Sequence, residues 1–351
     1  MMCYNKKWSL MTQEQTGGIH MRKDTPTMKD VARLAGVSQP TVSYVINGSA
    51  SISQEVKDRV NSAIQALNYK PNYNAKALKT NTSKIVGIII PDVVNQYYAR
   101  LLQILEEDLQ AKRYHLIIYS TSYDGTIEET SVRSLMSYNV HAIITLYQFT
   151  NPKCWDLLKD YGKPAVAIEG GQYCTKLGIP CINVDSHLGG YMATRHLLGL
   201  GRRRIAYVHQ NSDIDALQER RNGYIEAMRA AGLFREEDIF TTKNPNDKWN
   251  EGKNLGKRLA QLPYDGIITC SDLIAVGVIR ELLHAGKKVP DDVSVVGYDD
   301  VPIAELFIPA LTTIAQPLEE ICALAIKTIF DASARDVLPT LQPQLIKRES
   351  A

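Results

Sequence analysis

The chain lacks the patterns that would place it in a membrane or outside the cell. No apolar run approaches the length of about 18 residues that a membrane helix needs; Ile85 to Ile90 is among the longest runs, and Pro91 ends it. The first 18 residues are too polar to be the apolar core of a secretory signal. The six cysteines are scattered, with no C-x-x-C pair and no metal-ligand spacing. We therefore expect a cytoplasmic protein with free thiols and no membrane partner.

The signatures of the common enzyme classes are also missing from the sequence. There is no G-x-S-x-G around a nucleophilic serine, and no glycine-rich piece matches G-x-G-x-x-G or a P-loop. The seven histidines form no H-x-x-x-H pair. Adjacent carboxylates such as Asp299 and Asp300 are the remaining candidates for acid–base work, but neighbours in a turn usually point apart. We expect a protein that is not an enzyme and that carries no cofactor or metal.

The length and composition that are present indicate a globular protein of about two to three domains. The 351 residues are 44% apolar and 22% charged, which is ordinary for a chain that buries a sizeable core. The charge is uneven: residues 22–84 carry ten Lys or Arg against four Asp or Glu, a net +6, whereas residues 85–351 carry −5. A basic module on a mildly acidic body suggests a polyanionic partner for one end only, although a basic face can also be simply solvated.

Two short helices joined by a tight turn are predicted by the segment MKDVARLAGVSQPTVSYVING. In the first helix, Val31, Ala32 and Ala35 share one small apolar face. Gly36 then gives the backbone the freedom that a sharp reversal needs. Ala32 lies four positions before this glycine, and a small side chain there lets the two helices cross closely. With Val42 six positions after the glycine, the spacing fits a helix-turn-helix.

The second of these helices presents a polar face to solvent. Ser38 is its natural N-cap, and Pro40 falls in the first turn, where a missing N–H does no harm. Val42, Val45 and Ile46 form the buried stripe. The residues that we expect to meet DNA in a major groove are Ser38, Gln39, Pro40, Thr41, Ser43, Tyr44 and Asn47.

A third helix is expected after a cap at Ser53, with Val56, Val60, Ile64 and Leu67 on one face. Three short helices also suit a generic bundle without a role in DNA binding. The turn spacing and the charge of +6 favour DNA binding.

A further basic segment follows the three helices. Pro71 ends the bundle, and Asn72 is a candidate cap for one more short helix, which would order only against a partner. An exposed Leu78 flanked by Lys76 and Lys79 suggests a wedge that enters a minor-groove base step while the lysines hold phosphates. The alternative is a flexible linker with Leu78 packed on the next domain.

The large body after residue 83 alternates apolar segments with helical stretches. Continuous apolar strands suit sheets that are covered on both faces by helices, so the body is predicted to be α/β with parallel strands. The expected strands are Ile85–Ile90, His115–Ser120, Ala142–Leu146, Ala165–Ile168, Ile205–His209, Gly266–Thr269 and Val293–Gly297.

These features resemble the lactose-repressor (LacI/GalR) family of bacterial transcription regulators, over nearly the whole chain from about Met28 onward. Besides the helix-turn-helix segment, the blocks that carry the resemblance are LNYKPNYNAKAL, VGIIIPDVVNQYYARLL, INVDSHLGGYMATRHLLGLGRRRIAYV, RRNGYIEAM, DGIITCSDLIAVGVIREL, VPDDVSVVGYDD and LTTIAQPLEEI. So many ordered blocks are highly specific. Tyr44 stands where the family very often has arginine, and Arg202 where it commonly has histidine. The family's usual guanine contact from the position of Tyr44 therefore does not carry over, and the operator sequence cannot be read from the family.

The resemblance implies a two-lobed core of the periplasmic-binding-protein type (type I), preceded by an all-α helix-turn-helix domain and a short hinge helix. We expect a disordered extension at residues 1–25. Residues 1–20 are a candidate upstream-start artefact, because Met21 or Met28 would also begin the recognisable module. The helix-turn-helix domain is expected at residues 26–70, the hinge at 71–82 and the core at 83–351. The chain is expected to cross between lobes near Val184, Gln316 and Pro343. The N-lobe then comprises 83–183 and 317–343, and the C-lobe 184–316 and 344–351.

Polar residues after the expected strands are the candidates for ligand binding, because ligands gather at the carboxyl ends of parallel strands. A sugar would need carboxylates and amides for its hydroxyls and an aromatic face for its C–H side. By matching motifs, Arg220 in Arg-Arg-Asn-Gly-Tyr and Asp299 in Gly-Tyr-Asp-Asp correspond to the family's recurring ligand contacts. The other candidates are Asn95, Tyr97, Tyr98, Asp124, Glu169, Trp249, Asp272 and Gln316. For each of them a surface-loop or helix-capping role stays open.

The resemblance implies a transcription regulator, foremost a repressor, that binds a near-palindromic operator as a homodimer. It also implies control by a small molecule in the cleft between lobes. A sugar is the expected class, while purines, nucleosides and a phosphorylated protein corepressor stay open within the family. No leucine-heptad tail follows Pro343, which favours a dimer over a tetramer. The competing class is a sugar-binding protein whose N-terminal module serves only for dimerisation or tethering.

Overall fold

The computed structural model describes residues 26–46, 52–69, 83–334 and 338–351. Contacts divide the chain into two compact units, Met1–Ala75 and Lys76–Ala351, which are described separately below. The expected extension at 1–25 and hinge at 71–82 lie outside the described residues, as do the DNA-contact candidates Asn47, Lys76 and Leu78.

The first unit contains helices α1 (Met28–Ala35), α2 (Gln39–Ile46) and α3 (Gln54–Ala66). Thr27 begins α1 with a capping box: its hydroxyl accepts from the Asp30 N–H, and the Asp30 carboxylate accepts from the Thr27 N–H at 3.0 Å. Gly36 ends α1 with a φ of 64°, so the predicted reversal at this glycine is confirmed. Ser53 precedes α3 as predicted, but its side chain makes no capping hydrogen bond.

The core of this unit is small and joins all three helices. The predicted inward residues of α1, namely Val31, Ala32 and Ala35, are buried. The fully buried side chain on α2 is Val42, while Val45 and Ile46 are half-buried against the same core. Helix α3 contributes Val60 and Ala63, with Val56, Ile64 and Leu67 half-buried beside them, and Tyr69 closes the cluster.

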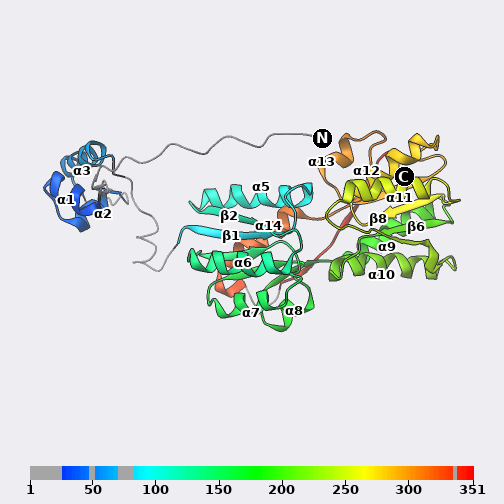
Figure 1. The fold of residues 1–351 in the computed structure, drawn as a ribbon, viewed down its shortest axis with the longest axis horizontal. Helices are drawn as coiled ribbons and strands as arrows, with labels where there is room; N and C mark the ends of the chain where they lie inside the picture. The colour runs from blue at the N-terminus through cyan, green and yellow to red at the C-terminus, as the bar shows by residue number, and fades with distance from the viewer. Residues whose placement is uncertain (1–25, 47–51, 70–82, 335–337) are drawn as a thin grey trace, which may run out of the picture. The chain divides into compact units, whose positions relative to one another are not determined.

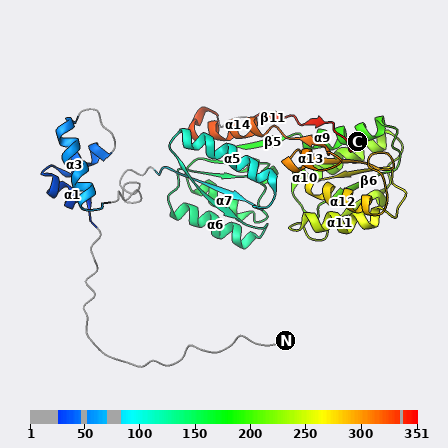
Figure 2. The same cartoon turned by 90° about the horizontal axis from the view of Figure 1, so that it is seen from above.

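The second unit is built on two six-stranded sheets (Figures 1 and 2). The first sheet has the order β11-β5-β4-β3-β1-β2 and consists of β1 (Ile85–Ile90), β2 (His115–Ser120), β3 (Ala142–Thr145), β4 (Ala165–Ile168), β5 (Cys181–Val184) and β11 (Thr340–Leu341). The second has the order β12-β10-β9-β8-β6-β7 and consists of β6 (Ile205–His209), β7 (Ile239–Thr241), β8 (Gly266–Thr269), β9 (Ser294–Asp299), β10 (Thr312–Ala315) and β12 (Gln344–Ile346). The pairings are parallel apart from β12, which runs antiparallel to β10.

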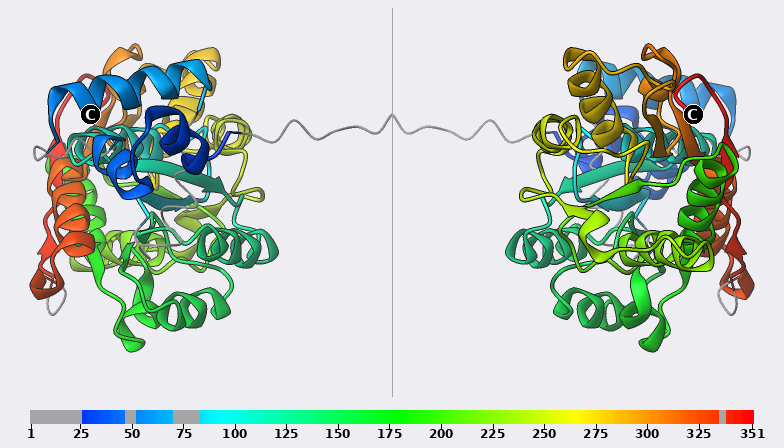
Figure 3. Two further views of the ribbon diagram at one scale, coloured as in Figure 1. Left: turned by 90° about the vertical axis from the view of Figure 1, so that its left-hand side faces the viewer. Right: turned by 90° about the vertical axis from the view of Figure 1, so that its right-hand side faces the viewer.

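Helices cover both faces of each sheet, as the end-on views in Figure 3 also show. Those around the first sheet are α5 (Gln96–Ala111), α6 (Gly125–Ser137), α7 (Lys153–Asp160), α8 (Gly171–Lys176) and α14 (Leu318–Phe330). Those around the second are α9 (Ser186–Gly199), α10 (Asp215–Ala230), α11 (Lys248–Leu259), α12 (Asp272–His284) and α13 (Pro302–Leu306). In the first lobe, one core lies under α5 and α14 and another under α6 and α7. This arrangement confirms the predicted α/β fold class.

The chain passes between the two sheets three times, after Val184, after Ala315 and after Leu341. The seven predicted strands are all present, with two changed bounds: β3 ends at Thr145, and β9 is shifted to Ser294–Asp299. The strands β5, β7, β10, β11 and β12 were not predicted, because they are only two to four residues long and several carry polar side chains.

Within the described ranges, no helix is long and apolar enough to cross a membrane. Nor do three or more His, Cys, Asp and Glu side chains there form a group that could hold a metal ion.

Candidate functional site

Helix α2 offers an exposed polar surface that is held in place by its own first turn. The Ser38 hydroxyl accepts from the Thr41 N–H at 3.3 Å and shares a hydrogen bond of 2.8 Å with the Thr41 hydroxyl, which confirms the predicted cap. Gln39 and Pro40 are exposed, and Tyr44 is 54% exposed. Thr41 and Ser43 are half-buried. The surface therefore combines hydroxyl, amide and aromatic groups, and α1 carries the exposed cations Lys29 and Arg33.

A cavity of about 460 Å³, counted with its open mouth, lies in the second unit between residues of the two lobes. Its lining comes from the N-terminal turn of α5, the loops after β2, β3, β4, β6 and β8, the end of β9, and α10 and α11. The lining residues are Asn95, Tyr97, Tyr98, Tyr123, Tyr147, Glu169, Gln210, Ile214, Ala216, Leu217, Arg220, Lys248, Cys270, Ser271 and Asp299.

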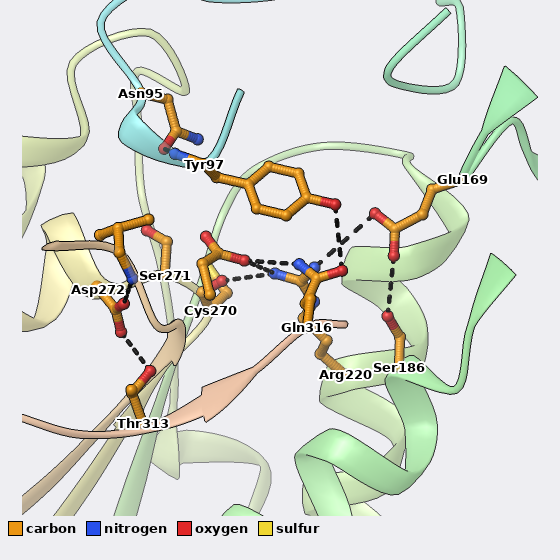
Figure 4. Close-up of polar contacts among 12 residues, drawn as sticks. Asn95, Tyr97, Glu169, Ser186, Arg220, Cys270, Ser271, Asp272, Thr313 and Gln316 are labelled. Carbon is orange, nitrogen blue, oxygen red and sulfur yellow. Dashed lines mark hydrogen bonds and ion pairs between the residues drawn. The ribbon is translucent and has the colours of Figure 1, made fainter. Parts of the chain in front are cut away.

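Arg220 is the central charge of the cavity, and close helix packing sets its position. Helix α10 carries it, and α9 approaches so closely that a Cβ on Gly190 would lie 1.9 Å from the Arg220 carbonyl oxygen. Its Nη1 donates to the Cys270 carbonyl at 2.9 Å, and its Cζ lies 3.7 Å from the centroid of the Tyr298 ring. The guanidinium is thus held by a backbone carbonyl, an aromatic ring and carboxylates at once, and Figure 4 shows its contact with Cys270.

Two carboxylates flank this guanidinium, one from each lobe: Asp299 is buried and Glu169 is 13% exposed. Asp299 Oδ1 lies 3.5 Å from Arg220 Nη1, and Glu169 Oε2 lies 3.9 Å from Arg220 Nη2. Burial raises the pKa of both carboxyl groups, and the nearby guanidinium offsets part of the rise. Burial alone would lower the pKa of Arg220, but Tyr298, Asp299 and Glu169 together raise it above its ordinary value. Arg220 therefore stays charged, and its charge favours the ionised forms of Asp299 and Glu169.

A hydrogen-bonded chain continues from this cluster to the N-lobe through a lobe crossing. Gln316 Nε2 donates to Asp299 Oδ1 at 2.8 Å, and the Tyr97 hydroxyl donates to Gln316 Oε1 at 3.2 Å (Figure 4). Gln316 follows β10, where the chain passes from the second sheet to α14. A ligand that engages Asp299 or Tyr97 therefore also touches the connection between lobes.

The N-lobe wall of the cavity is aromatic. Tyr97 and Tyr98 lie edge to face with ring centroids 5.1 Å apart, and Tyr123 and Tyr147 do so at 5.5 Å. The Tyr147 hydroxyl donates to the fully buried Glu128 at 2.7 Å. Such a wall supplies flat apolar faces with hydroxyls at their rims, which suits the C–H face of a sugar.

The structure brings most of the predicted ligand residues together. Six of them line the cavity, namely Asn95, Tyr97, Tyr98, Glu169, Arg220 and Asp299, and Gln316 contacts two of these six. The side chain of Asn95 is also the cap of α5, since it accepts from the Tyr97 N–H at 3.1 Å.

Three predicted residues do not line the cavity, because each has a structural task elsewhere. Asp124 is exposed and caps α6, and the Ile127 and Thr126 N–H groups lower its carboxyl pKa. Asp272 is buried and accepts from the Val301 N–H and the Thr313 hydroxyl. Trp249 packs half-buried against the core of the second lobe.

Five polar lining residues were not among the predicted ligand contacts: Tyr123, Tyr147, Gln210, Lys248 and Ser271. Tyr147 and Gln210 follow soon after strands that the sequence does predict, so the carboxyl-end rule could have found them. Lys248 is the first residue of α11, and no motif or predicted strand marks it.

Two family profiles match the chain. Residues 27–72 match the profile of bacterial regulatory proteins of the lacI family, and residues 194–351 match a periplasmic binding protein-like domain. The ribose operon repressor of Escherichia coli (strain K12) is 33% identical over 324 residues, covering 92% of this chain and 96% of that protein.

Solved structures agree with this relationship. A transcriptional regulator CelR–cellobiose complex has a TM-score of 0.68 at 28% identity, and the match covers 93% of this chain and all of that one. A lac repressor dimer bound to operator and the anti-inducer ONPF has a TM-score of 0.80 at 21% identity, covering 93% of this chain and 99% of that one, which shows the shared fold.

Proposed function

This chain belongs to the lacI family of bacterial regulatory proteins, and on that premise we propose that it is a cytoplasmic repressor whose operator binding is switched by a sugar-like effector in the cavity between its lobes. The transcriptional regulator role comes with the family. The observation that carries the finer proposal is the presence, in one chain, of an exposed polar helix face on α2 and a cavity centred on a buried guanidinium with two carboxylates.

Operator recognition is assigned to α2, which would enter the major groove. Gln39, Ser43 and Tyr44 carry groups that suit base edges and thymine methyls, while exposed Lys29 and Arg33 suit phosphates. The proposed contacts of Asn47, Lys76 and Leu78 lie outside the described residues and rest on the sequence alone. If Leu78 opens a base step, Leu78→Ala should weaken operator binding and leave non-specific binding nearly unchanged.

A second copy of the chain is the proposed partner for an exposed apolar face. Val94, Leu306 and Ile308 are 74%, 75% and 82% exposed, and exposed apolar side chains that lie together mark candidate interaction surfaces. They belong to one neighbourhood, because the Ile303 N–H of α13 donates to Gln96 Oε1 at the start of α5. In light scattering after gel filtration, Ile308→Asp should convert a dimer to a monomer. Leu200→Asp, at a half-exposed leucine after α9, should not.

The effector proposal is tested by a thermal-shift screen against sugars, sugar phosphates, nucleosides and purines. A ligand that binds only the folded chain raises the melting temperature with its concentration. Arg220→Ala and the nearly isosteric Asp299→Asn should abolish the shift from any true effector. Arg229→Ala, at an exposed arginine on the same helix, should leave it intact. A shift that survives both cavity variants would place the ligand elsewhere and refute the proposal.

The competing function is a sugar-binding protein whose helical module only tethers or dimerises. The two readings differ in the salt dependence of DNA binding. A repressor should bind a duplex selected from random sequence with a log–log salt slope of roughly −5 or steeper, because several Lys and Arg neutralise phosphates. A tethering module should show no selected site at all. A phosphoprotein corepressor gains weight only if every small molecule fails in the screen.

A further inference from the structure

Lys248 is a buried cation in the cavity that lacks an ion-pair partner. It is the first residue of α11, lines the cavity and is only 7% exposed. Among the described residues, the ion pairs within 4 Å involve other cations. The side chain is nearly buried and no carboxylate pairs with its charge, so the presence of this cation in a ligand cavity needs a reason.

The carboxylates that could neutralise Lys248 are engaged by other groups. Asp299 accepts from Gln316 and lies beside Arg220. Glu169 lies beside the same guanidinium and accepts from Ser186. Glu251, one turn along α11, accepts from the Lys243 N–H. Lys248 acts on Asp299 only at longer range, where its charge lowers the pKa that burial raises.

Further polar groups of the same wall have no partner, and all of them can donate. Gln210 Nε2, Arg220 Nε and the Ser271 hydroxyl are buried and make no hydrogen bond within the described chain. Two helices also begin at this wall: α11 at Lys248 and α12 just after Ser271, and neither N-cap side chain makes a capping hydrogen bond. Helix N-termini favour negative charge. The wall as a whole presents donors and positive charge to the cavity.

We propose that the effector is an anionic sugar, whose carboxylate or phosphate is held by Lys248, Ser271 and the N-termini of α11 and α12. The sugar ring lies against the tyrosines of the N-lobe, and its hydroxyls reach Asp299 and Glu169. This inference rests on the proposed effector site and adds the charge of the ligand to it.

The test uses isothermal titration of the full-length chain with matched sugars. The probes are D-glucose, D-glucuronate and glucose 6-phosphate, and D-ribose with ribose 5-phosphate. At least one anionic member should bind about 10- to 100-fold more tightly than its neutral counterpart, the range expected for a hydrogen bond between charged groups. The glucuronate and phosphate arms then distinguish which anion the wall accepts.

Three variants locate the effect. Lys248→Met should remove the preference for the anion, Lys248→Arg should keep most of it, and Lys257→Met, at an exposed lysine on the same helix, should change nothing. The unliganded Lys248→Met chain should melt at the same temperature as wild type or higher, because it loses an unpaired buried charge. A lower melting temperature would show that Lys248 has a structural partner and would overturn the inference.

The remaining outcomes separate this inference from the proposed function. If a neutral sugar binds more tightly than its anionic counterpart and Lys248→Met has no effect, the inference fails while the effector site stands. An anionic sugar that binds Lys248→Met and wild type equally also refutes it. If no member of either series binds, the anionic-sugar inference fails, whereas the sugar-effector proposal is judged by the wider thermal-shift screen and the DNA-binding proposal by its own salt slope.

Discussion

The two units of this chain reach their functional surfaces by different routes. In the helical unit, the cap at Thr27, the turn at Gly36 and the cap at Ser38 lie within 12 residues of each other, and each acts on its immediate neighbours. In the α/β unit, the contacts that build the cavity join residues 79 and 219 positions apart, as in Arg220–Asp299 and Tyr97–Gln316. Local rules therefore specify the first surface, whereas topology specifies the second.

This difference predicts that a substitution that destabilises one unit leaves the other unit folded. Calorimetry of the full chain is expected to resolve separate unfolding of the two units, because each has its own core. The following substitutions are chosen to move one transition at a time.

The largest effect is expected at the crossing of α9 and α10. Gly190→Ala would place a Cβ 1.9 Å from the Arg220 carbonyl oxygen, where backbone rather than a flexible side chain must move. We expect a loss of about 3 kcal/mol or more in the α/β unit, together with weaker ligand binding. Gly199→Ala on the same helix has open space around its Cβ and should be neutral or slightly stabilising. Equal effects of the two variants would contradict the close packing.

A pH effect of about 2–3 kcal/mol is expected from His209 in the same unit. Burial, together with the charge of Arg221, lowers the pKa of His209 to about 4. The unfolded chain takes up this proton below pH 6.5, so stability present above that pH is lost as the pH falls toward 4. His209→Gln should reduce the difference between the free energies of unfolding at pH 7 and pH 4.5, which urea unfolding measures. Exposed His284→Gln should not, and a wild-type slope in both variants would refute the assignment.

Buried carboxylates act in the opposite direction over the same pH range. Burial raises the pKa of Asp272 and Asp299, so the folded chain takes up their protons earlier than the unfolded chain does. The contribution of His209 is therefore measured as the difference in pH dependence between wild type and His209→Gln, because the carboxylates also affect the pH dependence of the wild-type chain.

In the helical unit, Ala32→Leu should cost about 1–3 kcal/mol through overpacking, since Ala32 is buried where α1 meets the other helices. The operator affinity of the full chain should fall, and the Kd for a cavity ligand should not change. Leu34→Ala, at an exposed neighbour, serves as the control. A shift of the α/β transition by Ala32→Leu would show that the two units do not unfold independently.

The smallest effect is expected at the capping box of α1. Thr27→Ala removes the hydroxyl that accepts from the Asp30 N–H, and about 1 kcal/mol of stability should be lost. Thr27→Ser keeps the hydroxyl and should stay close to wild type. If the alanine and serine variants lose the same stability in calorimetry, the cap does not contribute.

What the sequence predicts follows the same division between local and distant contacts. The turn at Gly36, the cap at Ser38 and the buried Val42 are confirmed, because each depends on residues a few positions away. The strands with a continuous apolar run, such as β1 and β4, and the α/β class are confirmed for the same reason. Short strands such as β5, with alternating burial, carry too little pattern to be found.

The cavity residues differ in whether the sequence can predict them. Arg220 and Asp299 were found through motifs, and structure adds what the motifs do not contain: the bond from Gln316 and the ring of Tyr298. Asp124 and Asp272 follow strands as the rule requires, but a carboxylate in that position can equally cap a helix or accept a backbone N–H. Lys248 enters from a helix terminus, and only the packing of α11 reveals it.

An effector that switches operator binding must couple the two units, and a pair of titrations measures this coupling. The Kd of the best compound from the screen is measured with and without saturating selected operator, and the Kd of the operator with and without that compound. Both Kd values should change by the same factor, roughly 5- to 150-fold, because linkage between two binding sites is reciprocal. Ligand affinity that is identical with and without operator, while both sites bind, would contradict this coupling.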